Sequence, residues 1–228
     1  MDPDIPFRPD HDADIPLIAD PAVAAIPVHD CGEPLVDLQG LLRVDTKRGD
    51  PRGMFALVRS GIRDRLLEAE RSLPAGTHVL VVEAYRPLAL QRRIYESYRA
   101  QLLEEYPEME PGEVDVMATR YVAPVDLAPH TCGAAVDLTL CDADGAELDM
   151  GCEEGATPEE SAGACYMDVP GLGATAQANR ALLRAALGGA GMVNYPTEWW
   201  HWSFGDRYWA LVSGADHALY GPTHPDGS

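Results

Sequence analysis

The chain has 228 residues, of which 46% are hydrophobic and 24% charged, proportions typical of a single globular enzyme domain. Its 37 acidic and 17 basic side chains give a formal net charge of -20, and such a surface repels phosphate backbones and anionic lipid headgroups. We therefore expect neither a nucleic acid nor a membrane partner.

The N-terminus is acidic and proline-rich, without the basic start and apolar run of a secretory signal, and no stretch approaches a membrane helix of roughly 18 apolar residues. The expected location is the cytoplasm. Five cysteines without a C-x-x-C pair favour reduced thiols over a disulfide framework or a thiolate zinc cage. Cys132 is interpreted as a small buried side chain.

The first half of the chain predicts an arm, two helices and a strand. Residues 1–29 alternate Asp, Pro and short apolar clusters, which indicates an irregular arm ahead of a domain over residues 30–228. Apolar spacing predicts an amphipathic helix at residues 54–73. A β-branched run predicts a buried strand at residues 77–84, and a second helix follows it at residues 88–106.

The second half predicts two helices, at residues 111–121 and 174–187, and strands at residues 134–141, 192–202 and 207–212. The elements mix without regular βαβ alternation. We therefore expect an α+β fold of one domain, with a small antiparallel sheet flanked by helices.

The Gly-rich, acidic stretch at residues 151–173 is expected to be a long surface loop that covers a pocket.

Two imidazoles and two carboxylates stand in a pattern that suits metal chemistry. His130 precedes the strand that contains Asp137, and Glu198 and His201 lie far downstream. Two imidazoles and one carboxylate form a common catalytic zinc shell, because three protein ligands leave the fourth position open for water. Each of these signals is weak when taken alone, and their combination predicts a zinc site in a central cleft.

Three motifs occur in one order along the chain: Tyr85-Arg86-Pro87 after a strand, His-x-x-Gly-x-Ala-x-Asp from His130 to Asp137, and Glu-Trp-Trp-His from Glu198 to His201. In this combination the chain resembles the peptidase family of the VanX-type D-alanyl-D-alanine dipeptidases. The likeness extends over about residues 30–220, nearly the whole chain.

The resemblance implies a function and a set of roles. It implies a zinc-dependent dipeptidase that hydrolyses D-Ala-D-Ala, or a related D-amino-acid dipeptide, by attack of a water activated by one zinc ion per chain. His130, Asp137 and His201 correspond to the zinc ligands, Glu198 to the general base, and Arg86 to the group that stabilises the transition state.

The sequence departs from this family where the substrate is held. An aspartate that grips the substrate ammonium follows Met-Gly in the family, whereas Met150-Gly151 is followed here by Cys152, Glu153 and Glu154. Glu153 and Glu154 are the candidate replacements. Ala128 also stands where the family has a serine.

Tyr85 is a third candidate for substrate contact. Tyr85 and the tryptophans near Glu198 are, however, typical of a core or a pocket wall.

The spacing of Glu198 and His201 predicts a local irregularity. Residues three apart in a regular strand lie on opposite faces, yet both side chains must face one metal. We therefore expect a bulge or an irregular turn near Trp199 and Trp200.

Two alternatives remain open at this point: a D,D-carboxypeptidase acting on longer cell-wall peptides, which needs an open cleft, and a zinc-containing binding protein without catalysis. Other divalent ions also suit such a ligand set. The oligomeric state is left open.

Overall fold

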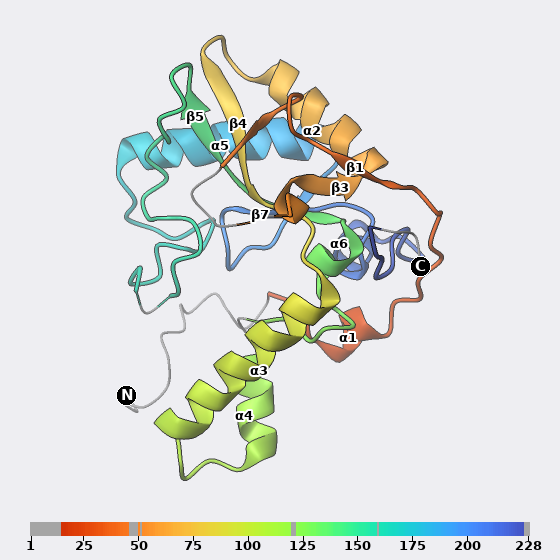
Figure 1. The fold of residues 1–228 in the computed structure, drawn as a ribbon. Coiled ribbons are helices and arrows are strands. Elements are labelled where there is room, and N and C mark those ends of the chain that lie inside the picture. Colours follow the sequence, from red (N-terminus) through yellow and green to blue (C-terminus); the bar gives the residue numbers. More distant parts are fainter. Residues whose placement is uncertain (1–14, 46–49, 51, 120–121, 159, 226–228) are drawn as a thin grey trace.

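A five-stranded sheet forms the centre of the protein (Figure 1). The computed structural model describes residues 15–45, 50, 52–119, 122–158 and 160–225. The strands lie in the order β2 (Arg43–Val44), β4 (Thr77–Glu83), β5 (Ala135–Asp142), β7 (His201–Ser203) and β6 (Val193–Asn194). All neighbouring pairs in this sheet are antiparallel except β2 and β4. The predicted α+β fold with a small, mainly antiparallel sheet is confirmed.

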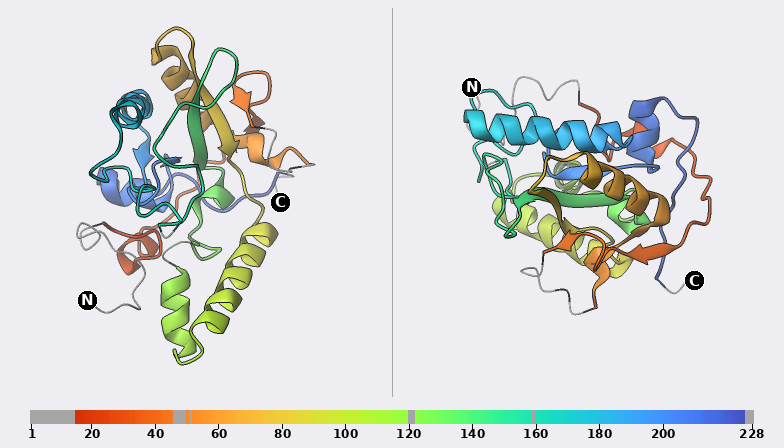
Figure 2. Two further views of the ribbon diagram at one scale, coloured as in Figure 1. Left: turned by 90° about the vertical axis from the view of Figure 1, so that its left-hand side faces the viewer. Right: turned by 90° about the horizontal axis from the view of Figure 1, so that it is seen from above.

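The helices cover the sheet unevenly. Helices α2 (Ser60–Ser72) and α5 (Ala174–Gly189) lie side by side against it, as the view from above shows (Figure 2). Helices α3 (Leu88–Glu105) and α4 (Pro111–Ala118) form a hairpin that projects from the opposite side. Two short helices, α1 (Pro21–Ala24) and α6 (Arg207–Ser213), pack against each other.

The main core lies between the sheet and helices α2 and α5. It contains Val79, Val81, Val136, Leu138, Leu140, Ile62, Leu66, Leu183 and Leu187, each at most 1% exposed. Burying one such side chain stabilises the fold by about 1.5–3 kcal/mol. Because successive side chains of a strand point to opposite faces, Asp137 faces away from this core.

The helix predicted at residues 54–73 is wrong in its first turns. Residues Met54–Ala56 form a 3₁₀ turn, and Leu57–Arg59 form β3, which pairs antiparallel with β1 (Leu35–Asp37). The helix itself begins at Ser60. Backbone hydrogen bonds to β1 here outweigh the helical spacing of the side chains, a tertiary effect that periodicity cannot reveal.

The edge strand predicted at residues 207–212 is also wrong, because these residues form helix α6. The carboxylate of Asp206 accepts hydrogen bonds from the backbone N–H groups of Tyr208 and Trp209 and so caps the first turn. Gly214 ends the helix with a φ of 69°.

Apart from the strand predicted at residues 192–202, the other predicted elements agree with the structure to within a few residues. The predicted strands at residues 77–84 and 134–141 correspond to β4 and β5, and the helices at 88–106 and 174–187 to α3 and α5. The short helix predicted at residues 111–121 corresponds to α4, although residues 120–121 lie outside the described ranges.

The predicted arm is described from residue 15 onward and contains α1. Val28 forms a β-bridge with Ala218 near the other end of the chain, which fixes the arm against the domain. The boundary at residue 30 remains a prediction. Among the described residues, no helix has the length and apolar character that crossing a membrane requires.

Candidate metal centre and active site

Two carboxylates and one imidazole stand in one row across the sheet. In the antiparallel register, Glu83 of β4 pairs with Asp137 of β5, and Asp137 pairs with His201 of β7. Directly opposite residues on antiparallel strands have Cβ atoms about 4.5–5.5 Å apart on the same face. The sheet therefore brings Glu83, Asp137 and His201 together from distant parts of the chain.

An irregularity in β4 gives Glu83 its place in this row. Val81 pairs with Leu138, and the register then shifts so that Glu83 pairs with Asp137. Without the shift, Val82 would oppose Asp137 and Glu83 would point toward the core, because a slip of one residue exchanges the two faces. The irregularity turns the end of β4 toward the site, as β-bulges beside active sites commonly do.

His130 comes from a 3₁₀ turn, Pro129–Cys132, immediately before β5. Its Nδ1 donates a hydrogen bond of 2.7 Å to the carbonyl of Ala84, and its own carbonyl accepts one from the Arg86 N–H. Because Nδ1 carries the proton, Nε2 of a neutral ring has a free lone pair. A carbonyl partner of this kind commonly orients a metal-binding histidine.

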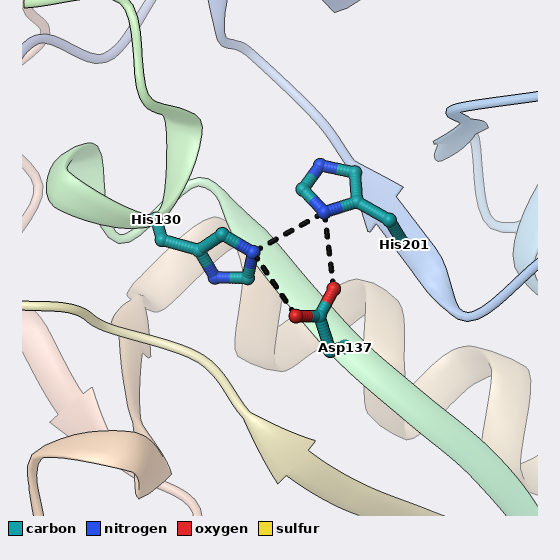
Figure 3. A group of neighbouring side chains, drawn as sticks. All are labelled: His130, Asp137 and His201. Atoms are coloured by element: carbon teal, nitrogen blue, oxygen red, sulfur yellow. Dashed lines mark hydrogen bonds and ion pairs between the residues drawn. The ribbon is translucent and has the colours of Figure 1, made fainter. Parts of the chain in front are cut away.

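Figure 3 shows the ligand atoms of His130, Asp137 and His201 turned toward one another. His130 Nε2 lies 3.2 Å from His201 Nδ1 and 3.3 Å from Asp137 Oδ2, and His201 Nδ1 lies 3.0 Å from Asp137 Oδ1. All three side chains are buried, and their ligand atoms lie within 4.8 Å of one another.

Burial acts to raise the pKa of Asp137, yet the charges and hydrogen bonds of His130 and His201 outweigh it and hold this pKa below its usual range. Asp137 therefore offers an anionic oxygen atom beside two imidazole nitrogens. Two imidazoles and one carboxylate fit a divalent metal ion with a preference for nitrogen and oxygen ligands.

The chain between β6 and β7 turns back before it reaches His201. The Glu198 N–H donates to the carbonyl of Tyr195, and the His201 N–H donates to the carbonyl of Glu198, so residues 195–200 form a loop. The predicted irregular turn near Trp199 and Trp200 is confirmed, whereas the single strand predicted at residues 192–202 is wrong. That segment is a hairpin of β6 and β7.

The turn directs Glu198 toward the three ligand atoms. Its Oε2 lies 3.8 Å from His201 Nδ1. Burial raises the pKa of Glu198 to about 7, and Asp137 adds to this effect while His201 and Arg86 oppose it. A carboxyl group with a pKa near neutrality can both take up and release a proton at physiological pH.

Arg86 is held by two side chains. Its Nε donates a hydrogen bond of 2.5 Å to Glu83 Oε1, and its Nη1 donates one of 2.7 Å to Gln91 Oε1. Burial opposes the charge of Arg86, but Glu83, Asp137 and Glu198 outweigh burial and raise the pKa of the guanidinium. Arg86 is therefore a fixed cation beside the metal centre.

A cavity of about 330 Å³, at the small end of the range of small-molecule sites, is lined by Arg86, His130, Asp137, Glu198 and His201. Among its described lining residues, Asp137, Glu154 and Glu198 carry carboxyl groups. Glu153 is not among these described lining residues.

Tyr85 is fully buried outside this cavity lining, and its hydroxyl donates a hydrogen bond of 2.7 Å to the carbonyl of Thr223.

Residues 154–158 and Cys165, from the loop predicted at residues 151–173, form part of the cavity wall. Arg180 of α5 secures the loop by donating hydrogen bonds to the carbonyls of Met150, Ala164 and Tyr166. The backbone N–H of Trp199 donates a hydrogen bond to the Cys165 carbonyl, which links the loop to the turn that contains Glu198. The expectation that this loop covers a pocket is confirmed.

The tryptophans and Cys132 are buried, as expected. Trp199, Trp200 and Trp202 are each less than 5% exposed, and Trp200 lines the cavity. Burial raises the pKa of the Cys132 thiol to about 12, so this cysteine remains protonated.

Three residues beside the centre were not among the candidates predicted from the sequence: Glu83, described above, Gln91 and Tyr195. Gln91 is 1% exposed and connects Arg86 with the carbonyl of Ala123. Tyr195 packs its ring edge-on against His201, with the ring centroids 5.9 Å apart. Gln91 could be recognised from the sequence, because a glutamine on the buried face of a helix, one turn after Pro87, requires hydrogen-bond partners for its amide. Tyr195 has no such signal.

A buried His/His/Asp cluster beside a carboxyl group of raised pKa and a fixed arginine has the groups that a metal-dependent hydrolase uses. The family model described as D-ala-D-ala dipeptidase (Peptidase_M15) matches residues 46–217. The chain belongs to this family and is a metallopeptidase.

Two curated relatives carry the same name. The D-alanyl-D-alanine dipeptidase of Synechocystis sp. is 30% identical over 232 residues, which cover 89% of this chain and 91% of that protein. The D-alanyl-D-alanine dipeptidase of Escherichia coli K12 is 33% identical over 128 residues, which cover 56% of this chain and 55% of that protein.

Among solved structures, the vancomycin resistance D,D-pentapeptidase VanY from a VanB-type cassette, a variant in complex with Zn(II), is 18% identical with a TM-score of 0.39. The match covers 90% of this chain and 89% of that chain.

Proposed function

We propose that this protein is a cytoplasmic zinc dipeptidase that hydrolyses D-Ala-D-Ala or a closely related D-amino-acid dipeptide. The observation that carries the proposal is the convergence of His130, Asp137 and His201 beside Glu198 in a small cavity. The family membership and the two dipeptidase relatives support the substrate class.

The three buried ligands suit one zinc ion. A zinc ion held there would polarise the substrate carbonyl and make water more acidic, which is the chemistry that amide hydrolysis needs. The side chains of the protein would transfer the proton and stabilise the developing negative charge.

Glu198 is the proposed general base. Its carboxylate takes the proton of the attacking water and afterwards gives it to the leaving amine, and a pKa near neutrality suits both steps. Because Glu198 lies 3.8 Å from His201 Nδ1, it is close enough to serve water at the metal centre.

Arg86 is the proposed partner of the negative charge that develops on the carbonyl oxygen. Glu83 and Gln91 fix its guanidinium before substrate arrives, so little reorganisation is needed when the charge forms. A preorganised donor of this kind contributes roughly 3–4 kcal/mol to transition-state stabilisation.

Glu154 is the proposed partner of the substrate ammonium. Of the two glutamates considered from the sequence, Glu154 belongs to the described cavity lining, which favours it over Glu153. Tyr85 is less suited to substrate contact, because its hydroxyl is engaged by the carbonyl of Thr223.

The alternatives receive less support. A cavity of about 330 Å³ suits a dipeptide better than a long cell-wall peptide. A protein that only bound zinc would have no need of Glu198 with a raised pKa or of the anchored Arg86. All five cysteines are described and free of disulfides, which favours a reducing compartment such as the cytoplasm.

The test is an assay of dipeptides of defined chirality, with and without a chelator. We expect hydrolysis of D-Ala-D-Ala that stops on chelation and returns with added zinc. Hydrolysis of L,L-dipeptides alone, or of longer peptides alone, would contradict the proposed substrate. Absence of any hydrolysis would favour the binding protein.

A further inference from the structure

A residue of the N-terminal arm contributes to the catalytic cavity. Ile18 is 6% exposed and lines the same cavity as Arg86, His130 and Glu198. It is more than one hundred positions from the nearest predicted metal ligand in the sequence. The three motifs that carry the chemistry therefore do not account for the whole wall of the site.

The arm is fixed in this position by contacts outside the cavity. Arg207 Nη1 donates a hydrogen bond of 2.6 Å to the carbonyl of Ala24, and the His29 N–H donates one of 2.9 Å to the carbonyl of Ala218. Helix α1 lies on the same side of the sheet as α3 and α4 (Figures 1 and 2). The anchored arm holds Ile18 in place without support from substrate.

Ile18 packs against residues that lie close to the metal centre. Its hydrophobic cluster includes Tyr195 and Ala123, which also line the cavity. The Ile18 N–H donates a hydrogen bond of 3.5 Å to the Tyr195 hydroxyl, and the Tyr195 ring packs edge-on against His201. Tyr195 therefore contacts both Ile18 and His201, a predicted metal ligand.

The cavity combines a polar and an apolar lining. The polar part includes the groups assigned to the chemistry and several hydroxyl side chains, while Ile18, Ile94, Val122 and Ala123 contribute hydrocarbon side chains. An apolar wall of this kind discriminates substrates by the size of the alkyl group it faces. One methylene in a hydrophobic pocket changes kcat/KM by roughly 10–200-fold.

We propose that Ile18 is a specificity-determining residue, and that its side chain limits the substrate to methyl-sized side chains. The inference rests on the proposed dipeptidase function and adds a selectivity residue to it. The branched side chain of Ile18 occupies space that a larger substrate side chain would need, and the anchored arm prevents it from yielding.

The test measures kcat/KM for D-Ala-D-Ala, D-Leu-D-Ala and D-Ala-D-Leu with the full-length chain and its Ile18→Val and Ile18→Ala variants. The readout is the ratio of kcat/KM for each leucyl dipeptide to that for D-Ala-D-Ala. We expect this ratio to rise about tenfold in Ile18→Ala for at least one leucyl dipeptide, and by less in Ile18→Val.

Val23→Ala is the matched control. Val23 is fully buried in the same arm and the same hydrophobic cluster, but it is not among the described residues that line the cavity. We expect Val23→Ala to lower Tm and leave the ratio unchanged. An equal rise of the ratio in Val23→Ala would overturn the role of Ile18, because general loosening of the arm would then explain it.

The outcomes separate this inference from the proposed function. Unchanged ratios in an active Ile18→Val variant would overturn the inference alone. A parallel fall of kcat/KM for all three dipeptides would do the same, since it would assign Ile18 a purely structural role. Failure of the unaltered protein to hydrolyse any dipeptide would overturn the proposed function and the inference together.

Discussion

Gln91 accepts a hydrogen bond of 2.7 Å from Arg86 Nη1 and donates one of the same length to the carbonyl of Ala123. The buried amide thereby connects the proposed transition-state cation to the backbone that follows helix α4. The orientation of Arg86 depends on both this bond and the ion pair with Glu83.

The Gln91→Leu variant tests this dependence. Removing a hydrogen-bond partner from a charged group costs about 1.5–3 kcal/mol, so we expect kcat/KM to fall at least tenfold, mainly through kcat, with unchanged zinc content. Gln91→Glu keeps an acceptor for Arg86 and should retain more activity. Gln101→Leu, an exposed site on the same helix, is the control. A loss confined to KM would contradict a positioning role.

Arg86 itself is tested by Arg86→Ala and Arg86→Lys. If its guanidinium acts only when the oxyanion forms, Arg86→Ala lowers kcat and kcat/KM much more than it raises KM. The lysine variant should rescue little, because a point charge on a flexible stem cannot engage Glu83 and Gln91 as the planar guanidinium does. Steady-state kinetics with D-Ala-D-Ala distinguishes these cases, and full activity of Arg86→Lys would show that positive charge alone suffices.

Glu198→Gln separates proton transfer from metal binding. The substitution keeps the size of the side chain but removes the base, so we expect turnover to fall by about 100-fold or more while one zinc ion per chain is retained. Metal analysis of the purified variant is the necessary companion to the assay. Loss of zinc together with activity would mean that Glu198 is a ligand.

Chelation should destabilise the protein as well as inactivate it. A ligand that binds only the folded state stabilises it by about 4 kcal/mol at a free concentration 1,000 times its Kd. We therefore expect a chelator to lower Tm, and added zinc to restore it. In Asp137→Asn, which lacks the proposed anionic ligand, the chelator should change Tm far less. An equal shift in both proteins would place the stabilising metal elsewhere.

Gly133→Ala tests the turn that carries His130. Gly133 has a φ of 64°, and a Cβ atom there would lie 2.4 Å from Leu35 Cδ2 and 3.3 Å from the Arg59 backbone nitrogen. The backbone conformation alone costs about 1–2 kcal/mol for a residue with a Cβ, and the overlap adds about 1–3 kcal/mol. Gly76→Ala, with a φ of 83° and no atom within 4 Å, carries only the backbone cost.

Urea unfolding of both variants gives the comparison. We expect Gly133→Ala to lose more free energy of unfolding than Gly76→Ala and to bind zinc more weakly, because His130 shifts with its turn. Equal destabilisation of the two variants would show that Leu35 moves aside without cost.

Local sequence patterns revealed much of this structure. The β-branched run of β4 and the helical spacing of α3 predicted their elements, and the three-residue spacing of Glu198 and His201 predicted the turn between them. These features depend on neighbours along the chain. Periodicity and spacing along the sequence are therefore enough to predict these elements and this turn.

The features that sequence reasoning missed depend on contacts between distant residues. Residues 57–59 look helical until β1 is available to pair with them. Helix α6 is an exception, because the Asp206 carboxylate that caps it accepts from the neighbouring N–H groups of Tyr208 and Trp209. Ile18 carries no chemical signal at all, because an isoleucine in an arm gives no indication of the cavity that it lines.

The row formed by Glu83, Asp137 and His201 also determines when the centre can assemble during synthesis. His201 follows Asp137 by 64 residues, and the two meet only through the pairing of β5 with β7. At about 5–20 residues per second, a ribosome needs roughly 3–13 s to add that stretch. A nascent chain that ends before Glu198 has two of the three proposed ligands and lacks the proposed base, so the proposed centre is complete only after residues 198–201 have been added.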